Sequence, residues 1–406
     1  MAKRLILGLS AGPSADGIRA ALIDVAGRGL EMQVKVPAAH TEGFDAELRQ
    51  LLLQVSTPEA SDLRQLALVH RVLGEAFALT ARRLADRASV SLPQILCIGC
   101  LGFDAWHKAD KPYSAALTLG AAAVMAERLG ITVMHDFRWR DLACQGIGSV
   151  LTAVPTHLLF HAPEETRLVL HLGGLTQAVL LPAGAGLGEV QAWEIGPGNA
   201  LLNALVEKLT QGRERYDAGG HHAVQGRQIP DLLHNWLLHP ALLRAHPRAT
   251  PRSGFAEQMA RQAIALAEQH QWQARDLLCT AHHLIALSVK ESLKHRLQPA
   301  QPVKVVLTGG GAKNGFLWRL LEEQLEGLPL VRSDTLGVPS EGAMAVQAAV
   351  LAGLLVDGTP GNLPQATGAS GARVLGSITP GSASNWAVCL DWFTGREADY
   401  PPWEED

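Results

Sequence analysis

The stretch LILGLSAGPSADGIRAALIDV, residues 5–25, decides the fold class of this chain. Two apolar runs of strand length, 5–9 and 18–25, flank a turn rich in Gly, Pro, Ser and Asp, and this pattern predicts a β-hairpin. A second unit of the same kind, RLVLHLGGLTQAVLL, occupies residues 167–181 and turns at Gly173 and Gly174. Each half of the chain therefore opens with a strand–turn–strand unit, which indicates a weak internal duplication.

Length and composition predict two globular domains. The chain has 406 residues, more than one hydrophobic core usually serves, and 47% of them are hydrophobic and 18% charged. We expect a first lobe over residues 1–160, which carries the first hairpin. We expect a second lobe over residues 161–406, which carries the second hairpin, a Gly-rich loop and an irregular tail.

Charge, apolar runs and cysteine content exclude several classes of protein. The net charge of −4 gives no basic excess for nucleic acid, and no run of eighteen apolar residues predicts a membrane span. Residues 5–7 are too short an apolar run for a signal peptide. Five cysteines do not make a disulfide framework, so we expect a cytoplasmic protein. The sequence leaves a homodimer open.

Hydrophobic periodicity and turn residues predict further elements along the chain. Helices are expected over residues 45–54, 62–88, 114–129, 199–211, 255–270, 276–295, 315–325 and 340–354, and strands over residues 94–99, 131–135 and 303–307. The segment after residue 358 is rich in Gly, Pro, Ser and Thr and is expected to be irregular, with a strand over residues 386–392.

Three glycine-rich turns are candidate phosphate-binding loops. They lie at residues 8–17, at Gly173-Gly174 and at residues 308–314. Glycine lets backbone N–H groups approach a phosphate closely, and the third turn also precedes a predicted helix N-terminus. Plain hairpin turns and a helix-entry loop are the simpler interpretations. The G-x-S-x-G match at residues 8–12 precedes a strand, whereas a nucleophile elbow needs a helix there.

Asp136, Arg138 and Asp141 come at and just after the end of the predicted strand 131–135. The carboxyl ends of strands are where functional groups gather in α/β sheets. A carboxylate there can act as a general base and an arginine can hold an anion. Surface ion pairs are the alternative interpretation.

Two further carboxylates lie beside predicted helix starts. Glu194 is in the segment WEIGPGN, which predicts a turn with Asn199 as a helix cap, and Glu341 opens the predicted helix over residues 340–354. A capped helix and a favourable helix-dipole interaction explain these two positions without any function.

Taken in order, these segments resemble the anhydro-N-acetylmuramic acid kinase family from residue 8 to residue 381. The resemblance runs through GLSAGPSADGIR (8–19), DFRWRD (136–141), HLGGLTQ (171–177), EIGPGN (194–199), GGGAKN (309–314), LGVPSEGAMA (336–345) and GNLPQATGA with VLG (361–376). Each motif alone is short, but the collinear series is specific for the family.

The resemblance implies an α/β fold of the actin–hexokinase (ribonuclease H-like) type, with two lobes and a nucleotide cleft between them. It implies ATP and Mg²⁺ as cofactors and a small-molecule sugar as substrate. Family members convert 1,6-anhydro-N-acetylmuramic acid from recycled cell wall, with water, to N-acetylmuramic acid 6-phosphate. Asp141 is the implied base for the attacking water, and Glu341 the implied catalytic partner that holds the sugar or the water.

The same resemblance implies the binding residues. Asp16 is expected to hold Mg²⁺ through water. The expected ATP-binding residues are Gly12, Pro13, Ser14, Ala15, Asp16, Gly17, Ile18, Arg19, Gly173, Gly174, Gly309, Gly310, Gly311 and Asn314. The expected sugar-binding residues are Asp136, Arg138, Glu194, Gly196 and Asn199.

The chain departs from the family pattern at several of these sites. Pro13 replaces the Thr of the first loop, and Arg19 replaces the Asp that ends it. The family segments G-x-H-G-Q-T and G-G-Q-G-A-P-L are GCLGFD (99–104) and QGIGSVL (145–151) here, and K-S-T-G-R-E is reduced to Arg252-Ser253.

These departures keep three alternatives open. Besides a working kinase of the family, the sequence allows a kinase for a different sugar or a catalytically weak ATP-binding relative with a regulatory or structural role. It also allows an interaction protein of the heat-shock or actin type on the same fold. Fold alone does not decide among them.

Overall fold

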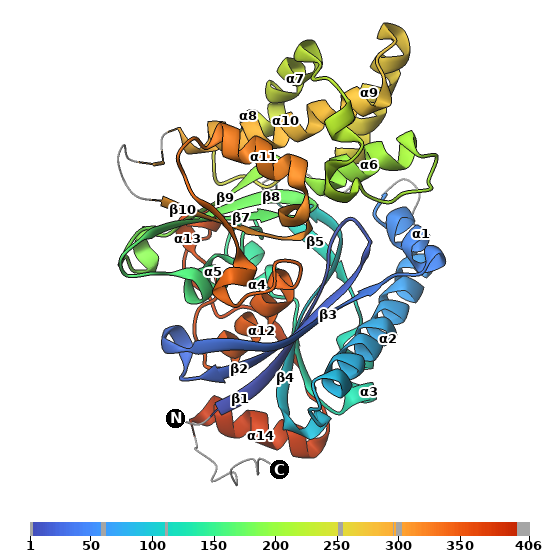
Figure 1. The fold of residues 1–406 in the computed structure, drawn as a ribbon. Helices are drawn as coiled ribbons and strands as arrows, with labels where there is room; N and C mark the ends of the chain where they lie inside the picture. The colour runs from blue at the N-terminus through green and yellow to red at the C-terminus, as the bar shows by residue number, and fades with distance from the viewer. Residues whose placement is uncertain are drawn as a thin grey trace.

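The computed structural model describes residues 3–57, 62–109, 113–250, 255–294, 296–297 and 303–395. Within these residues, three buried clusters of apolar side chains lie between two β-sheets and the helices that pack on them. Helices therefore cover the outer face of each sheet, and further helices lie between the two sheets (Figure 1).

The first sheet has the strand order β3-β2-β1-β4-β6. Strands β1, β2 and β3 are antiparallel neighbours, whereas β4 runs parallel to β1 and β6 runs parallel to β4. Short strands β5 and β12 add to β4 and β6. The bounds are β1 (Lys3–Ala11), β2 (Gly17–Ala26), β3 (Gln33–Gly43), β4 (Ile95–Lys108), β5 (Ala115–Leu119), β6 (Thr132–His135) and β12 (Ser377–Thr379).

The second sheet repeats the same connectivity in the order β9-β8-β7-β10-β11. Its first three strands are antiparallel neighbours, and β10 and β11 follow in parallel. The bounds are β7 (Thr166–Leu172), β8 (Leu175–Leu181), β9 (Gln191–Pro197), β10 (Val303–Thr308) and β11 (Leu330–Arg332). The duplication predicted from the two hairpins is confirmed, and the repeated order is that of the predicted actin–hexokinase (ribonuclease H-like) fold.

The helices divide by sheet face. Helices α1 (Ala46–Val55), α2 (Leu63–Arg87) and α3 (Ala122–Leu129) cover the outer face of the first sheet. Helices α6 (Asn199–Leu209), α7 (Pro230–Leu237), α9 (Phe255–His270), α10 (Ala274–Leu293) and α11 (Gly315–Gln324) cover the outer face of the second. Helices α5 (Ala153–Phe160) and α12 (Ala343–Val356) lie between the sheets. The remaining helices are α4 (Arg138–Ala143), α8 (Pro240–Leu243), α13 (Pro364–Thr367) and α14 (Ala383–Thr394).

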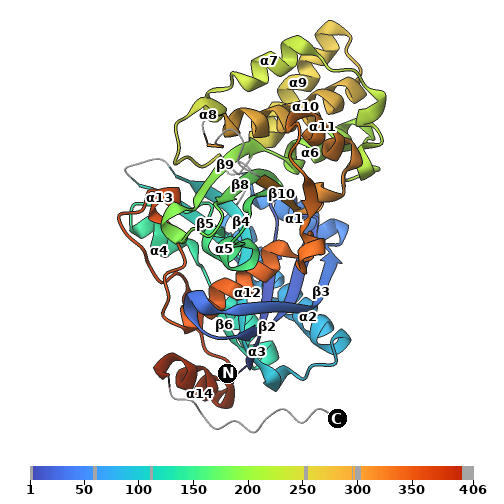
Figure 2. The same ribbon diagram turned by 60° about the vertical axis from the view of Figure 1, so that its left-hand side comes forward.

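Helix α12 is apolar around its whole circumference because it packs on both sides. It lies in the middle of the molecule in two views (Figures 1 and 2), in contact with β1, β2 and β4. Two glycines let it lie directly on the first sheet. A Cβ atom at Gly8 would lie 1.8 Å from the carbonyl oxygen of Ala345, and one at Gly99 would lie 2.1 Å from that of Ala348.

Three predicted elements are wrong. The helix expected over residues 114–129 is strand β5 followed by α3, because Gly120 has φ +123° and helical backbone needs a negative φ. The strand expected over residues 386–392 lies in helix α14, whose N-cap Ser382 accepts a hydrogen bond from the Asn385 N–H. The turn expected over residues 193–199 is mostly strand β9, an edge strand that tolerates Pro197.

The chain also crosses between the predicted lobes. Helices α12 and α14 pack on the first sheet, and β12 pairs with β6, although all three belong to the range 161–406. The division into lobes at residue 160 stays a prediction, while α14 packs on the first sheet and α12 lies between the two sheets. No helix in the described residues is long and apolar enough to cross a bilayer.

We predict that Gly8→Ala destabilises the protein by about 3 kcal/mol, because the new methyl group collides with the α12 backbone. Urea denaturation of wild type and variant measures the difference. Gly188→Ala is the matched control, since a Cβ there meets no atom within 4 Å, and it should change stability by less than about 0.5 kcal/mol. Equal effects of the two substitutions would contradict the packing of α12 on Gly8.

Candidate active site

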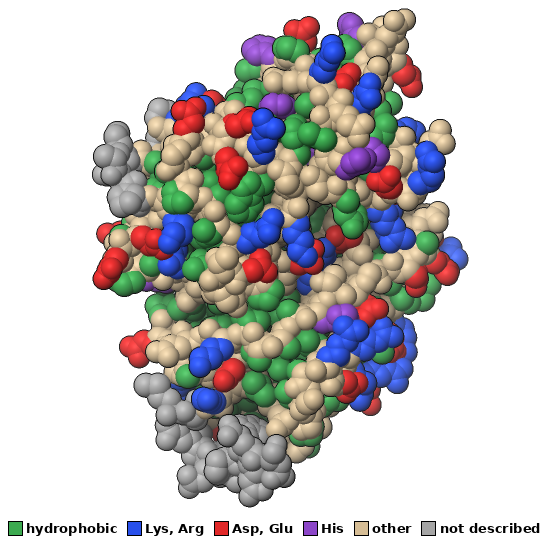
Figure 3. Space-filling model, viewed as in Figure 1, with side chains coloured by type: hydrophobic (Ala, Val, Ile, Leu, Met, Phe, Trp, Pro, Cys, Tyr) green, Lys and Arg blue, Asp and Glu red, His purple; other side chains and the backbone are tan. Residues whose placement is uncertain are grey.

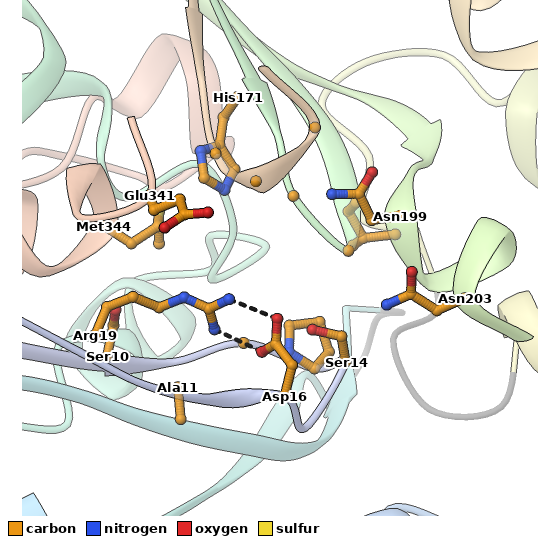
Figure 4. Close-up of a pocket in the computed structure, with 18 of the residues that line it drawn as sticks. Ser10, Ala11, Ser14, Asp16, Arg19, His171, Asn199, Asn203, Glu341 and Met344 are labelled. Carbon is orange, nitrogen blue, oxygen red and sulfur yellow. Dashed lines mark hydrogen bonds and ion pairs between the residues drawn. The ribbon is translucent and has the colours of Figure 1, made fainter. Parts of the chain in front are cut away.

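A cavity of about 600 Å³ opens between the two sheets. Its walls come from the β1–β2 turn of the first lobe, the β7–β8 turn and the Gly-rich loop after β10 of the second, and the start of α12 (Figure 4). This volume suits a small-molecule site. On the face shown in Figure 3, charged side chains of both signs lie beside one another across the middle of the molecule.

The first hairpin places an ion pair at the floor of the cavity. The β1–β2 register sets Arg19 opposite Ser10, and the turn is closed by a 3.1 Å hydrogen bond from the Ala15 N–H to the Gly12 carbonyl. Arg19 Nη1 and Nη2 each donate to one carboxylate oxygen of Asp16 at 2.6 Å. The guanidinium therefore grips the carboxylate end-on with two parallel hydrogen bonds.

Both groups of this pair stay ionised. Burial would raise the pKa of Asp16, but the hydrogen bonds and charge of Arg19, helped by Ser14, hold that pKa below its ordinary value. Burial would likewise lower the pKa of Arg19, but Asp16 and the charge of Glu341 raise it. A fixed positive charge thus faces Glu341 across the cavity.

The second hairpin approaches the first one closely. A Cβ atom at Gly174 would lie 2.7 Å from Pro13 Cγ, so only glycine lets the two turns come so near. His171, one residue before the end of β7, also lines the cavity, and its Nδ1 lies 3.0 Å from Thr308 Oγ1. Burial, together with the positive charge of Arg19, lowers the pKa of His171 to about 4. This imidazole is therefore neutral near pH 7.

The third loop and the start of α12 close the upper wall. The Gly309 N–H donates to the Ser340 carbonyl at 2.8 Å, which fixes the loop to the segment that carries Glu341. Lys313 Nζ lies 3.0 Å from Glu341 Oε1. Asn314 caps α11 by accepting the Leu317 N–H at 3.0 Å. Glu341 precedes α12 instead of opening it, because the helix begins at Ala343.

The cavity brings together many of the residues singled out in the sequence, and others lie behind its wall. Those that line it are Gly12, Pro13, Ser14, Asp16, Arg19, Arg138, Gly173, Gly174, Asn199, Gly309, Gly310, Gly311, Asn314 and Glu341. Those that do not are Ala15, Gly17, Ile18, Asp136, Asp141, Glu194 and Gly196. The expected segment Arg252-Ser253 lies outside the described residues.

Asn199 is the first residue of α6 and does not cap it. Its side-chain amide donates to the Leu172 carbonyl at 3.1 Å, while its backbone N–H donates to the Gly173 carbonyl at 2.8 Å. The expectation of a side-chain cap is therefore wrong, because this amide ties α6 to the second hairpin instead.

Asp141 is fully buried, with 0% exposure. One oxygen accepts the Gly148 N–H at 2.9 Å, and the other accepts the Asn362 amide at 2.7 Å and the Thr367 hydroxyl at 2.8 Å. These donors tie the loop after α4 and the segment around α13 to one carboxylate. In this arrangement Asp141 holds loops together and does not reach the cavity.

Glu194 and Asp136 also lie outside the cavity lining. Glu194 is buried and accepts hydrogen bonds from Ser149, from Gln177 at 3.3 Å and from the Thr250 N–H at 2.6 Å. Gln177 lines the cavity, so Glu194, which lies outside the cavity wall, holds the amide of that residue in place. Burial raises the pKa of Asp136 to about 6, although Arg138 opposes that shift.

Several cavity residues were not identified as binding residues from the sequence. Asp104 accepts hydrogen bonds from Arg138 and, at 3.1 Å, from Thr118. It ends the segment GCLGFD, which we described only as a departure from the family pattern. The other cavity residues of this kind include His171, Asn203, Arg215, Asp217, Lys313 and Met344. His171 and Lys313 lie within motifs whose glycines drew attention instead, because those glycines suit a phosphate-binding backbone.

The glycine loops fit a nucleotide polyphosphate. The backbone is open at Gly12 and Gly310, where a Cβ would find its nearest neighbours 3.7 and 3.8 Å away. Backbone N–H groups of such open turns, from both lobes, can face the same phosphates. ATP would lie against Gly12, Gly173, Gly174 and the loop from Gly309 to Gly311.

The carboxylates do not fit a magnesium site. Each carboxylate that lines the cavity already has partners in the described residues: Asp16 has Arg19, Asp104 has Arg138, Glu341 has Lys313, and Asp217 accepts the N–H groups of His222 and Ala223. Among these residues there is no group of three or more His, Cys, Asp or Glu side chains that could hold a metal ion. A divalent cation bound directly to Asp16 would compete with the guanidinium, which already donates one hydrogen bond to each carboxylate oxygen.

We predict that Asp141→Asn destabilises the protein by about 1–3 kcal/mol, because the new amide places an N–H group against one of three existing donors. Urea denaturation of both proteins measures the change. Asp86→Asn, at an exposed position of α2, is the control and should change stability by less than about 0.5 kcal/mol. A variant as stable as wild type would contradict the hydrogen bonds at Asp141.

We predict a pH-dependent contribution from His171. Unfolded chains protonate histidine near pH 6.5, whereas folded His171 protonates only near pH 4. Its contribution to stability is complete above pH 6.5 and falls as the pH drops toward 4, by up to about 2 kcal/mol between pH 7.5 and 5. Urea denaturation at both pH values should show a smaller pH effect in His171→Gln. An unchanged pH effect would contradict a His171 side chain that stays neutral in the folded protein.

Comparison with known proteins assigns the chain to a family. The family model described as "Anhydro-N-acetylmuramic acid kinase" matches residues 4–381. A protein of that name from a Cyanothece species is 33% identical over 380 residues, which cover 92% of this chain and 98% of that protein. One from Gloeobacter violaceus is 35% identical over 379 residues, 93% of this chain and 98% of that protein.

A ROK hexokinase from Thermus thermophilus is a more distant similarity among solved structures. It is 17% identical, with a TM-score of 0.36 over 85% of this chain and 97% of that one. The family match instead covers almost the whole chain, including the glycine loops that line the cavity. The chain belongs to the anhydro-N-acetylmuramic acid kinase family.

Proposed function

We propose that this chain is an ATP-dependent kinase that converts 1,6-anhydro-N-acetylmuramic acid and water to N-acetylmuramic acid 6-phosphate in cell-wall recycling. The single observation that carries the proposal is the cavity between the lobes, lined by glycine turns of both hairpins and by Glu341. The names of the relatives support the choice of sugar. A cytoplasmic location and a homodimer stay predictions.

In this reaction the same oxygen of the sugar, O6, is released from C1 and receives the phosphoryl group. Water attacks C1 of the sugar, the C1–O6 bond breaks, and O6 takes the γ-phosphoryl group as ADP leaves. The proton of the attacking water must pass to a base. Such a transfer depends mainly on positioning and charge stabilisation. In this chain, the glycine loops would orient the phosphates, and Arg19 would face the charge that develops on them.

Glu341 is the carboxylate with access to the reaction. Its side chain is 41% exposed and lines the cavity opposite Arg19, and Lys313 holds one of its oxygens. We propose that Glu341 holds the sugar or the attacking water. Asp141 as the base for that water also stays a proposal, and it requires the loop of residues 146–150 to open a path to the cavity.

A second candidate function follows from the burial of Asp141. A general base has to come within hydrogen-bond reach of the proton it takes, directly or through one water. If the loop in front of Asp141 does not open, the chain binds ATP without efficient turnover and serves a regulatory or structural role. Kinetic measurements on the purified protein separate the two candidates.

The test is ADP release from ATP with and without 1,6-anhydro-N-acetylmuramic acid, with mass spectrometry of the product. We expect sugar-dependent release that yields the 6-phosphate. Glu341→Gln should lower kcat/KM by about 100-fold or more, because it removes a charge that contacts the reacting groups. Glu323→Gln, the same change in an exposed pair with Arg319 on α11, is the control and should retain wild-type rates.

Two outcomes would contradict the proposed function. Nucleotide binding without sugar-dependent ADP release would support the second candidate. Release that depends on a different sugar would keep the kinase and replace the substrate.

A further inference from the structure

The pair of Arg19 and Asp16 changes the charge of the phosphate-binding hairpin. The family pattern has an Asp at the position of Arg19, so a family member carries two carboxylates there, with a combined charge of −2. Here the guanidinium of Arg19 donates to both oxygens of Asp16 at 2.6 Å, so a cation lies in contact with the carboxylate and offsets its charge. The feature that would attract a divalent cation is therefore absent at this hairpin.

The guanidinium of Arg19 has donors left after it binds Asp16. Nη1 donates to Asp16 at 2.6 Å and lies 3.2 Å from the Gly17 carbonyl, while Nη2 donates once to Asp16 at 2.6 Å. A guanidinium has five N–H groups in a fixed planar fork. Among the described residues, the edge formed by Nε and the second Nη2 hydrogen keeps no protein acceptor. That edge is the one with which arginine grips a phosphate through two parallel hydrogen bonds.

The position of this edge is suited to the nucleotide. Arg19 lies on the cavity floor below His171 and Glu341, between the first hairpin and the loops of the second lobe (Figure 4). Because burial lowers the pKa of His171 to about 4, this neighbouring side chain carries no positive charge near pH 7 and leaves Arg19 as the cation at this place. Asp16 acts as a positioning residue, because its two oxygens fix the plane of the guanidinium and thus the direction of the open edge.

A purely structural salt bridge explains the pair less well. The side chains of Arg19 and Asp16 are 18% and 36% exposed, and partly exposed ion pairs contribute little to stability. The pair also crosses only three positions of one turn, so it does not join distant parts of the chain. Its clearest consequence is a rigid cation aimed at the space where phosphates would lie.

We propose that Arg19 supplies, from the protein, the positive charge that Mg²⁺ would otherwise bring to the phosphates at Asp16, so that nucleotide binding by this chain depends only weakly on divalent cations. The proposal rests on the proposed function in that it takes ATP as the ligand of the cavity. It adds a residue with a defined role in binding that nucleotide.

The experiment is calorimetric titration with AMPPNP, a nucleotide analogue that is not hydrolysed, once in Mg²⁺ and once in EDTA. For wild type we expect the two Kd values to agree within about threefold. Arg19→Gln should raise Kd in EDTA by about tenfold or more, since hydrogen bonds to a charged group are lost. Mg²⁺ should restore part of that affinity in the variant.

Arg19→Asp is the sharper variant because it recreates the two-carboxylate hairpin. We expect its Kd in EDTA to exceed its Kd in Mg²⁺ by about tenfold or more. Mn²⁺ alone, followed by electron paramagnetic resonance, should bind to Arg19→Asp and not to wild type. Arg215→Gln is the matched control, because Arg215 also lines the cavity but donates to the Phe44 carbonyl at 3.3 Å, and it should keep the wild-type ratio of the two Kd values.

The result that would overturn the inference is a wild-type protein with the metal dependence of Arg19→Asp, or an Arg19→Gln variant equal to wild type in both buffers. Thermal denaturation of every variant ensures that folded proteins are compared. Strong metal dependence together with sugar-dependent turnover would overturn this inference alone. Weak metal dependence without turnover would overturn the proposed function alone.

Discussion

The structure depends on the close contact between helix α12 and the glycines of two neighbouring strands. Gly8 of β1 and Gly99 of β4 leave no side chain between strand and helix, so the helix backbone rests on the sheet. A helix that is hydrophobic all round must be buried on all sides, and α12 meets this demand between the two sheets. The same helix begins two residues after Glu341 and includes Met344, and both residues line the cavity, so the helix that packs on both sheets also forms part of one cavity wall.

Charge pairing is the second property that decides what the cavity can bind. The four carboxylates of its lining are each held by a cation or by backbone N–H groups. The cations paired with Asp16, Asp104 and Glu341 reduce the unbalanced negative charge on which a magnesium site relies. The glycine turns contribute N–H groups without adding charge, so phosphate recognition here rests on backbone donors together with Arg19.

Much of the fold could be predicted from the sequence because its signals are local. The two hairpins are read from strand-length apolar runs around glycine turns, and their repetition indicated a weak internal duplication, which the two sheets of the same connectivity bear out. The return of α12, β12 and α14 to the first sheet could not be predicted, because nothing local in those segments says which sheet they cover. The helix α14 was mistaken for a strand because Trp386, Val388 and Trp392 suit either structure, and the decisive Ser382 cap stands outside that run.

The cavity was predicted less completely than the fold for a physical reason. Glycine turns offer backbone N–H groups whatever their neighbours, and Gly12, Gly174 and Gly310, which we predicted to bind ATP, line one cavity. A side chain's role depends instead on its partners. Asp141 has the residue type of a base but meets three donors from the segments around it and lies buried. Arg19 stands where the family pattern has an Asp, so its residue type alone suggests a lost function. Its contact with Asp16, three residues away, uses one edge of the guanidinium and leaves the other edge for the cavity.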